Sequence, residues 1–274
     1  MADGHLRPEE GSGYAMLAGL RGKSVVVTGG AGVIGSAVSR RLAAEGALVV
    51  VADLDADAAK TVAELIGGAA VGVGVDITTP LGAQASVDAA VQAFGKLDLY
   101  HANAGVECTV QAVADFDPAD YHRVFGVNVL GAFLSAQAAL RQLSAQGDGG
   151  SILFTASIAA LMGSVGTSVY NASKHAVQGI ARCLALEVAG AGIRVNTLAP
   201  GLVESRMMDA LGAGLGALAG ADGTTYKGRM EGAVPLGRYA TPEEIAATAA
   251  WILSDEVPYL HNECITVGGG IAPY

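Results

Sequence analysis

The stretch Ser24-Val-Val-Val-Thr-Gly-Gly-Ala-Gly-Val-Ile-Gly35 joins a short apolar run to a glycine-rich turn. Residues 24–28 have the composition of a buried strand, and residues 36–45 have that of a helix. Glycines 30, 32 and 35 therefore give the spacing G-x-G-x-x-G at a strand-to-helix junction. Without side chains the turn is tight, and its backbone N–H groups can approach a pyrophosphate at the helix N-terminus. The stretch predicts a dinucleotide-binding unit.

Seven short apolar runs alternate with segments of helical length along the 274 residues. Runs rich in Val, Ile and Leu, separated in this way, indicate parallel strands covered by helices on both faces. The sequence thus predicts a single α/β domain with a Rossmann-type, doubly wound, seven-stranded parallel sheet. The runs are Ser24 to Thr28, Leu48 to Ala52, Val71 to Val75, Leu97 to Ala102, Ser151 to Ala156, Ile193 to Leu198 and Glu263 to Val267.

Two segments fall outside this alternation. Residues 1–20 precede the first unit, and we expect a flexible N-terminal extension there, followed by the domain at 21–274. Residues 201–237, between the sixth and seventh runs, are rich in Gly, Ala and Met and have no clear single period. A long insertion after a strand of a doubly wound sheet lies near the ligand. We therefore predict a substrate lid at about 201–237.

The composition indicates an acidic protein with a large apolar core, since 51% of residues are hydrophobic, 15% are charged and the formal net charge is −10. Binding to a phosphate backbone needs clustered Lys and Arg, so this balance argues against nucleic acid. The apolar stretches are far shorter than the ~20 residues of a membrane span. Residues 1–13 lack the basic start and apolar stretch of a secretory signal. We expect a cytoplasmic protein with no membrane segment.

The three cysteines, Cys108, Cys183 and Cys264, are widely separated and odd in number. This pattern indicates reduced core thiols rather than a disulfide framework or a zinc site. The histidines show no metal-ligand spacing either. We expect no metal site.

Acidic residues after the second and third runs bear on the cofactor. Asp53 lies eighteen residues beyond the last glycine of the turn, where a carboxylate can bond a ribose 2′-hydroxyl and would repel a 2′-phosphate. This favours NAD(H); Arg40 and Arg41 are the contrary signal, although their mid-helix positions suit surface roles. Asp55 is the expected cap of the next helix. Asp76 could bond the adenine amino group or cap the helix that follows it, and the sequence does not decide between the two.

Tyr170 and Lys174 are four residues apart, and Ser157 lies thirteen residues upstream, just after the fifth run. Residues four apart share a helix face, so the phenol and the ammonium can point into one pocket. A free tyrosine has a pKa near ~10, and we expect the neighbouring cation to lower it and make the phenol a usable acid and base. Because Tyr-x-x-x-Lys also occurs by chance, the assignment depends on the other motifs.

In order and spacing, these residues resemble the short-chain dehydrogenase/reductase family, of the classical type but with an atypical glycine loop. The resemblance implies that Tyr170 is the acid/base and that Ser157 hydrogen-bonds the substrate oxygen. It also implies that Lys174 binds the nicotinamide ribose and lowers the tyrosine pKa, and that Asn128 holds a water linking the lysine to solvent. The likeness covers Lys23 to Gly270, and its matching pieces are Thr28 to Gly35, Asp76, Asn103-Ala104-Gly105, Asn128, Ser157, Tyr170-x-x-x-Lys174 and Pro200-Gly201.

The resemblance further implies how NAD(H) is held. Pro200-Gly201 would lie against the nicotinamide, and Asn103-Ala104-Gly105 would support the adenosine side of the cofactor or serve the sheet alone. Family members are commonly tetramers built by helix pairing, so we expect a homo-oligomer that uses helices at 117–143 and 169–189. The residues predicted to bind the cofactor are Gly29, Gly32, Val33, Ile34, Gly35, Asp53, Leu54, Asp76, Ile77, Asn103, Ala104, Gly105, Tyr170, Lys174, Pro200, Gly201 and Val203.

Three positions depart from the family pattern. Val33 stands where classical members usually carry glycine, whereas Gly32 is typical of extended members that act on nucleotide sugars. His101 stands in the fourth run where an apolar residue is usual, and we expect it to fill the strand rather than to catalyse. Gly268 replaces a common aspartate. NAD binding is still expected.

The leading prediction is an NAD-dependent oxidoreductase that interconverts a secondary alcohol and a ketone by hydride transfer. The alternatives are an extended-type NAD-dependent epimerase/dehydratase, suggested by Gly32, and a non-catalytic dinucleotide-sensing protein. Length argues against the first, since 74 residues follow Pro200, and the complete catalytic set argues against the second. Apolar side chains after the catalytic serine and in the lid indicate an apolar substrate. They are Ala159, Leu161, Met162, Val165, Val203, Met207, Met208, Leu211, Leu215 and, as the one polar-tipped member, Tyr226.

Overall fold

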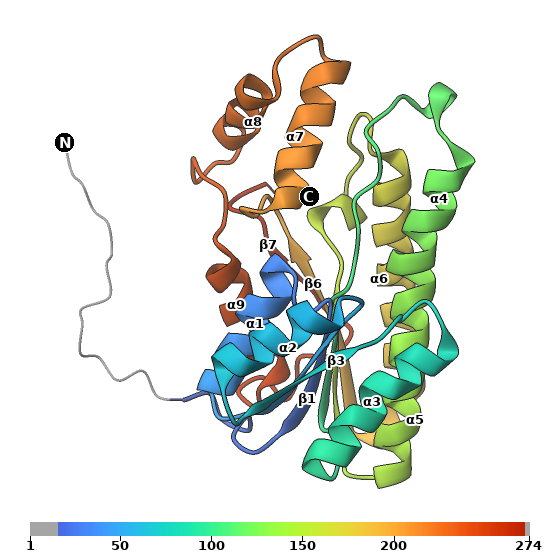
Figure 1. The fold of residues 1–274 in the computed structure, drawn as a ribbon, viewed down its shortest axis with the longest axis vertical. Helices are drawn as coiled ribbons and strands as arrows, with labels where there is room; N and C mark the ends of the chain where they lie inside the picture. Colours follow the sequence, from blue (N-terminus) through green and yellow to red (C-terminus); the bar gives the residue numbers. More distant parts are fainter. Residues whose placement is uncertain (1–15, 272–274) are drawn as a thin grey trace, which may run out of the picture.

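A seven-stranded sheet forms the centre of the molecule (Figure 1), and all its strand pairs are parallel, as predicted. The computed structural model describes residues 16–271. Every strand boundary falls within two residues of the predicted one. The strands are β1 (Ser24–Thr28), β2 (Leu48–Asp53), β3 (Ala70–Gly74), β4 (Leu99–Ala102), β5 (Gly150–Thr155), β6 (Ile193–Pro200) and β7 (Cys264–Val267).

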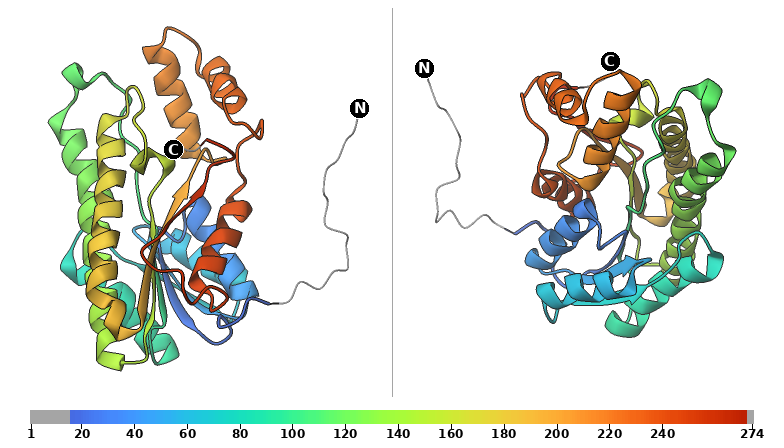
Figure 2. Two further views of the ribbon diagram at one scale, coloured as in Figure 1. Left: turned by 180° about the vertical axis from the view of Figure 1, so that it is seen from behind. Right: turned by 45° about the horizontal axis from the view of Figure 1, so that its top comes forward.

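Two layers of helices cover the sheet, one on each face (Figure 2). Each layer buries its own apolar cluster: Val25 and Val27 of β1 point toward one layer, and Val26 points toward the other. Because alternate residues point to opposite faces, a strand buried on both faces is a continuous apolar run. One layer contains α1 (Val33–Ala44), α2 (Ala56–Ile66) and α9 (Pro242–Leu253), and the other contains α3 (Pro80–Phe94), α5 (Ala132–Gln146) and α6 (Ser168–Val188).

The strand order β3-β2-β1-β4-β5-β6-β7 reverses direction between β1 and β4. The chain moves outward from β1 to β3 and then returns to place β4 beside β1. In doubly wound sheets, ligands bind outside the carboxyl ends of the strands at such a reversal. The turns after β1 and β4 begin at Gly29 and Asn103, so two of the predicted cofactor segments meet there.

The packed domain begins earlier than predicted. Leu20 is fully buried in the cluster that includes residues of α1 and α9, and the Leu17 N–H donates to the Glu45 carboxylate at 2.7 Å. The Asp255 N–H donates to Ala18 O at 2.9 Å. The predicted domain boundary at residue 21 was therefore too late, because residues 17–20 already pack against the domain. Residues 1–15 of the predicted extension lie outside the described residues.

The segment 201–237 contains two helices, α7 (Arg206–Leu218) and α8 (Gly223–Gly232), which stand above the carboxyl edge of the sheet (Figure 1). Ser205 and Asp222 cap them by accepting backbone N–H groups. The two helices approach closely, since a Cβ on Gly223 of α8 would lie 2.8 Å from Ala213 Cα of α7. Helices are recognised in a sequence by large apolar side chains at helical spacing. Small residues at these contacts replace such side chains, so the sequence showed no helical period here.

The helix caps decide whether Asp76 caps the helix that follows it, which was one of the two roles considered for this residue. Asp55 caps α2, as predicted, by accepting two backbone N–H groups. Asp76 does not cap α3, because Thr79 accepts the first-turn N–H there at 3.0 Å. Asp76 instead accepts from the backbone and hydroxyl of Thr78 at 2.9 and 2.7 Å. The capping alternative was wrong, and the exposed carboxylate stays available to a ligand.

Helix α4 (Pro118–Phe125) continues into α5 through a π-helical turn, Gly126–Gly131. The combined run Pro118–Gln146 is long and apolar enough to cross a membrane by composition alone. However, 44% of its most apolar window is buried inside the protein. A buried core helix passes the same test, so this run is weak evidence of a membrane segment.

The cysteines differ in their surroundings. Cys108 is buried and Cys264 is half-buried, and burial raises the pKa of both thiols. Cys183 is exposed on α6. All three are free thiols, so the expectation of core positions was wrong for Cys183.

Two glycines offer a matched test of the packing. Gly179 lies on the exposed side of α6, where an added Cβ meets nothing within 4 Å. Because alanine favours a helix more than glycine does, Gly179→Ala should raise the free energy of unfolding by about 0.5–1 kcal/mol. Gly35→Ala places a Cβ 2.0 Å from Gly29 O and should lower it by about 1–3 kcal/mol. Urea unfolding measures both changes, and a stable Gly35→Ala protein would contradict the tight turn.

Candidate active site

The glycine loop lies tightly between α1 and the turn after β4. Gly29 has a φ of 61°, and a Cβ there would lie 2.8 Å from Ala104 Cα. The first turn of α1 touches the same loop, as the 2.0 Å approach of a Gly35 Cβ to Gly29 O shows. Gly32 is less constrained, because its Cβ would meet Gly29 O alone, at 3.2 Å. The loop shape thus depends on Gly29 and Gly35 more than on Gly32.

Helix α1 begins at Val33 without a side-chain cap. The first N–H groups of a helix have no partner within it, so those of Val33, Ile34 and Gly35 can donate to a ligand. Val33, which stands where the family usually has glycine, is 38% exposed and does not fill the loop. Free N–H groups beside a loop with no room for side chains fit the pyrophosphate of a dinucleotide.

Asp53 ends β2 beside this loop and is half-buried. Its carboxylate accepts the Ala31 N–H at 3.0 Å and the Asp55 N–H at 3.2 Å, which ties the loop to the second strand. Leu54 beside it is 76% exposed. The structure therefore places Asp53 and Leu54 next to the glycine loop, where the adenosine half of a dinucleotide would lie.

Asp76 and Ile77 follow β3, but their side chains differ. Hydrogen bonds from Thr78 lower the pKa of the exposed Asp76, which keeps it a carboxylate. Ile77 is buried, and a Cβ on Gly131 would lie 2.7 Å from its Cδ1. Ile77 can therefore reach a cofactor through its backbone alone.

The arginines that could have favoured a 2′-phosphate have other partners. Arg40 lies 3.9 Å from Glu243 on α9, and Arg41 lies 2.8 Å from Glu45 within its own helix. The Arg40 pair lies on the surface, as the sequence suggested, whereas Arg41 is half-buried and its partner Glu45 is buried.

Asn103 joins three strands at their carboxyl ends. Its Nδ2 donates to Thr28 O at 3.0 Å and to Gly29 O at 3.4 Å, and its backbone N–H donates to Thr28 Oγ1 at 3.0 Å. The hydroxyl of Thr155, at the end of β5, donates to Asn103 Oδ1 at 3.1 Å. Asn103 therefore fixes the glycine loop from inside the protein rather than from the ligand side.

His101 supports this arrangement from within β4. It is buried, and its Nε2 lies 2.8 Å from Thr155 Oγ1. Because that hydroxyl donates to Asn103, His101 must donate from Nε2, and burial lowers its pKa to about 3. Its Nδ1 has no hydrogen-bond partner among residues 16–271. His101 fills the strand and orients Thr155, as expected of a residue with no catalytic role.

Tyr170 and Lys174 lie on α6 beside the end of β5. Lys174 is buried, and its Nζ donates to Thr155 O at 3.0 Å. The ammonium lies 5.7 Å from the centroid of the Tyr170 ring. A Cβ on Gly105 would lie 3.3 Å from both Lys174 Nζ and Asn128 Oδ1. The structure thus brings Lys174 and Asn128 together beside Gly105, with the Tyr170 ring next to Lys174.

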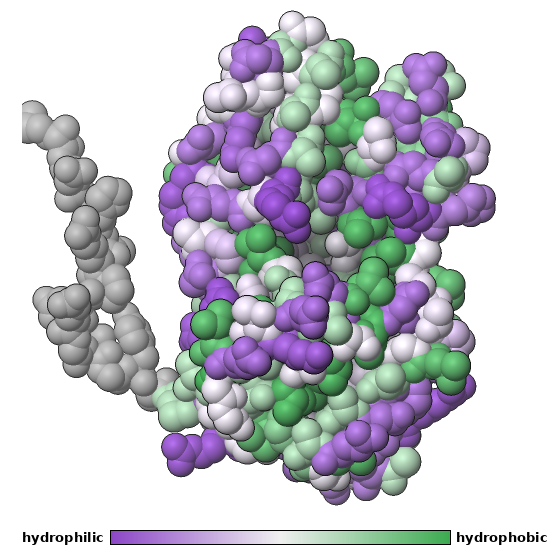
Figure 3. Space-filling view, viewed as in Figure 1, coloured by the Kyte–Doolittle hydropathy of each residue, from purple (hydrophilic) through white to green (hydrophobic). Residues whose placement is uncertain are grey.

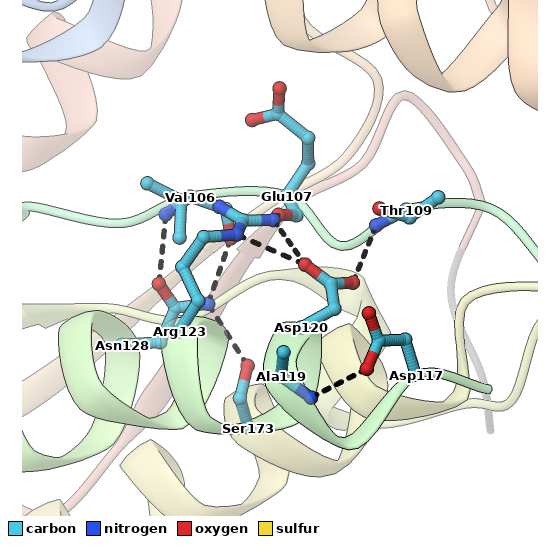
Figure 4. Close-up of polar contacts among 9 residues, drawn as sticks. All are labelled: Val106, Glu107, Thr109, Asp117, Ala119, Asp120, Arg123, Asn128 and Ser173. Carbon is cyan, nitrogen blue, oxygen red and sulfur yellow. Dashed lines mark hydrogen bonds and ion pairs between the residues drawn. The ribbon is translucent and has the colours of Figure 1, made fainter.

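Asn128 lies in the π-helical turn and holds the loop after β4 (Figure 4). Its Oδ1 accepts the Val106 N–H at 2.8 Å, while its Nδ2 donates to Val106 O and Ser173 Oγ, both at 3.0 Å. A carbonyl oxygen has two acceptor positions. Oδ1 therefore keeps a second acceptor position for the water that the resemblance implies.

The pKa of Tyr170 moves opposite to the expectation. Burial raises it to about 12; the Ser157 hydroxyl acts against this rise, and the charges of Cys108 and Glu107 add to it. Burial also lowers the pKa of Lys174 to about 8. The expected lowering was wrong for these surroundings, because the ammonium is directed to Thr155 O and desolvation of the phenol dominates.

Ser157 follows β5 and faces the end of β6. Its Oγ accepts the Ala159 N–H at 3.1 Å and donates to Pro200 O at 3.4 Å. Gly201 closely approaches the turn after β7, since a Cβ there would lie 2.8 Å from Gly268 Cα. The fourth predicted catalytic residue therefore lies beside the predicted nicotinamide segment.

Val203 is buried, so its side chain does not line the cofactor site. A bridge to Ala240 uses the backbone of Leu202 and Glu204, which turns the N–H and C=O of Val203 to the other side. Val203 can therefore meet a cofactor through its backbone.

Sequence reasoning missed residues 106–109, which together with the predicted Gly105 form the loop that we call the post-β4 loop (residues 105–109). The buried Asp120 carboxylate accepts the Thr109 N–H at 2.8 Å, and Arg123 donates to Asp120 at 2.6 Å and to Glu107 O at 2.7 Å (Figure 4). Cys108 packs in a cluster with Val169 and Tyr170. The available signal was the position of this loop, directly after Asn103-Ala104-Gly105.

Apolar residues from three segments close one side of the site. Val110 packs in a cluster with Met208 and Leu211 of α7, and a Cβ on Gly166 would lie 2.8 Å from Val110 and 3.6 Å from Leu215. The space-filling view shows a hollow near the centre of this face, bordered by both apolar and polar side chains (Figure 3). Helix α7 and the segment after Ser157 thus both pack against Val110.

Two predicted pocket residues lie elsewhere. Leu161 lines a separate polar cavity with Gln178 and Cys264, between α6 and the strands β6 and β7. Val165 is 79% exposed. The apolar run after Ser157 turns away from the site after its first residues, a change of direction that composition does not reveal.

The fold and the site define a dinucleotide-dependent oxidoreductase. Residues 29–272 match a family model described as enoyl-(acyl carrier protein) reductase. The chain is 34% identical to L-2,3-butanediol dehydrogenase of Corynebacterium glutamicum over 256 residues, which cover 91% of this chain and 98% of that protein. It is 35% identical to 3-alpha-(or 20-beta)-hydroxysteroid dehydrogenase of Mycobacterium bovis over 251 residues, 92% of this chain and 90% of that one.

A solved structure of NAD+-bound xylitol dehydrogenase superposes with a TM-score of 0.87 and 31% identity, over 92% of this chain and all of that chain. The protein belongs to the short-chain dehydrogenase/reductase family. It is an NAD(H)-dependent short-chain alcohol dehydrogenase/ketoreductase. The extended epimerase alternative gains no support, because these relatives are dehydrogenases of nearly the same length.

The position of Asp53 predicts how the cofactor preference can be changed. Asp53→Asn keeps an oxygen for the Ala31 N–H but removes the charge that would repel a 2′-phosphate. The ratio of kcat/KM for NAD to that for NADP should fall by about tenfold or more. Asp57→Asn, an exposed carboxylate nearby on α2, should leave the ratio unchanged. An unaltered ratio in Asp53→Asn would exclude Asp53 as the selecting residue.

Proposed function

We propose that the protein interconverts an apolar secondary alcohol and its ketone, with Tyr170 as the proton-transferring residue. The observation that carries this proposal is that Lys174 lies beside both Asn128 and the Tyr170 ring, with Ser157 beside the predicted nicotinamide segment. A non-catalytic dinucleotide sensor would need none of these side chains in one place.

In the proposed chemistry, NAD(H) transfers the hydride and Tyr170 transfers the proton. NAD(H) supplies the hydride acceptor or donor and, when oxidised, a positive charge that favours the phenolate. In oxidation, Tyr170 takes the hydroxyl proton, and the Ser157 hydroxyl hydrogen-bonds the developing alkoxide. Lys174 is well placed to hold the nicotinamide ribose and to stabilise the phenolate, and its proton exchange with solvent would pass beside Asn128. In reduction, Tyr170 returns the proton to the carbonyl oxygen.

The apolar character of the substrate rests on the walls of the pocket. Val110, Met208 and Leu211 pack in one apolar cluster, and we expect them to supply part of these walls, where methionine side chains adapt to varied ligand shapes. Lys227 pairs with Asp209 on the lid, which makes it less available to an anionic substrate. Relatives named for a butanediol and for hydroxysteroids are consistent with an uncharged alcohol.

Two further features belong to the proposal. A homo-oligomer, a tetramer by family analogy, would cover apolar side chains exposed on the helix layer of α4, α5 and α6, among them Tyr121, Leu130, Phe133 and Leu186. A cytoplasmic location is consistent with the free thiols. Fractionation of cells expressing the tagged protein would test the location.

Replacing Tyr170 tests the chemistry. In a panel of cyclic and linear secondary alcohols followed by NADH absorbance, Tyr170→Phe should lower kcat by about 10²–10⁴-fold, because general acid–base catalysis is lost. The affinity for NADH should change little. Tyr259→Phe, at a fully exposed phenol before β7, serves as the control. Near-normal turnover in Tyr170→Phe would overturn the assignment, and a panel in which charged sugars alone react would overturn the apolar substrate.

A charge on the exposed helix face tests the assembly. Phe133 is 45% exposed on α5, and Phe133→Glu should reduce the mass measured by light scattering, because burying an unpaired carboxylate is costly. Leu81→Glu, on an exposed position of α3, should leave the mass unchanged. A monomeric wild-type protein at micromolar concentration would contradict the oligomer.

A further inference from the structure

The post-β4 loop (residues 105–109) lies directly against the catalytic groups. Gly105 is in contact with Lys174 and Asn128, and Val106 is hydrogen-bonded through both its N–H and its C=O to Asn128. Cys108 packs in the cluster that includes Tyr170. Glu107 stands between these residues, so its backbone is fixed on both sides by the catalytic site.

The Glu107 side chain is half-buried and points away from the nearest cation (Figure 4). Arg123 binds the backbone oxygen of Glu107 at 2.7 Å, but its guanidinium pairs with Asp120, at 3.0 and 2.6 Å. Within residues 16–271 no hydrogen bond or ion pair engages the Glu107 carboxylate. A partly desolvated carboxylate without a partner is unfavourable unless a ligand supplies one.

The charge of Glu107 is felt at the reacting group, since it is among the causes that raise the pKa of Tyr170. Glu107 therefore lies close enough to the phenol to influence whatever is bound to it. Other residues near the phenol, Val169, Cys108 and Phe116, are largely apolar. Among apolar walls, a neutral donor is a better partner for a carboxylate than a second ion, which would have to be desolvated as well.

We propose that Glu107 is a specificity-determining residue whose carboxylate accepts a hydrogen bond from a second hydroxyl of the substrate, next to the carbon that is oxidised. The inference rests on the proposed function of the site and narrows its substrate to diols and the corresponding hydroxyketones. The second hydroxyl is not oxidised: the reacting carbon loses hydride to NAD and its hydroxyl proton to Tyr170. A substrate carboxylate at the same place is repelled by Glu107.

The test compares cyclohexanol with 1,2-cyclohexanediol, which differ by the second hydroxyl alone. The wild-type enzyme should show a higher kcat/KM for the diol, and Glu107→Ala should reduce the diol-to-alcohol ratio by about tenfold or more, the effect of one hydrogen bond to a charged group. Glu107→Gln keeps a side-chain acceptor and should retain part of the ratio. Asp115→Asn, an exposed carboxylate in the turn before α4, is the matched control.

The pH profile gives a second readout that a structural role would not move. Oxidation requires the phenolate, so kcat/KM rises as pH increases through the pKa of Tyr170. Because the Glu107 charge raises that pKa, Glu107→Gln should shift the rising limb to lower pH with cyclohexanol as substrate. The fold is monitored by thermal unfolding of each variant.

The outcomes separate the two proposals. If the wild-type enzyme with NAD oxidises neither cyclohexanol nor any other secondary alcohol of the panel, the proposed function is wrong. If it oxidises cyclohexanol but shows no diol preference, or if Glu107→Ala keeps the wild-type ratio while folded, the role of Glu107 is wrong and the proposed function stands.

Discussion

The hydrogen bonds of Asn103 are the interaction on which the site depends. One side chain binds the backbone of β1 at Thr28 and of the glycine loop at Gly29, and it accepts the hydroxyl of Thr155 at the end of β5. Asn103 itself follows β4. The glycine loop, the post-β4 loop and the segment of Ser157 thus follow the three strands β1, β4 and β5, which this side chain connects. Their relative positions are therefore set by polar contacts at the carboxyl edge, while the apolar clusters on either face hold the sheet together.

The carboxyl edge of the sheet also supplies a hydrogen-bond acceptor for the buried ammonium of Lys174. Lys174 is buried, and its pKa is lowered to about 8 by desolvation, yet its ammonium has a backbone acceptor in Thr155 O. Thr155 thus serves both neighbours, with its carbonyl bound to Lys174 and its hydroxyl bound to Asn103. Loss of either bond would leave a buried polar group unpaired, which costs about 1–3 kcal/mol.

Much of the fold could be predicted, because strands buried on both faces are continuous apolar runs and the glycine spacing marks the first turn. The identities of Ser157, Tyr170 and Lys174 followed from their spacing and from the family resemblance. The helices of residues 201–237 could not be predicted, because Gly and Ala pack closely without a regular pattern of large side chains. The raised pKa of Tyr170 and the place of Glu107 depend on burial and on side-chain direction, which neighbouring sequence does not determine.

The π-helical turn at Gly126–Gly131 has a consequence for how the chain can change. Asp120 before the turn binds Thr109, and Asn128 within it binds Val106, so one helix holds the post-β4 loop at two points. A π-helical turn contains an extra residue and rotates less per residue than an α-helix. Removing one residue from it would turn Asn128 away from Val106 while leaving Asp120 in place. The register of this helix is thus a part of the active site, and substitutions are tolerated there more readily than changes in length.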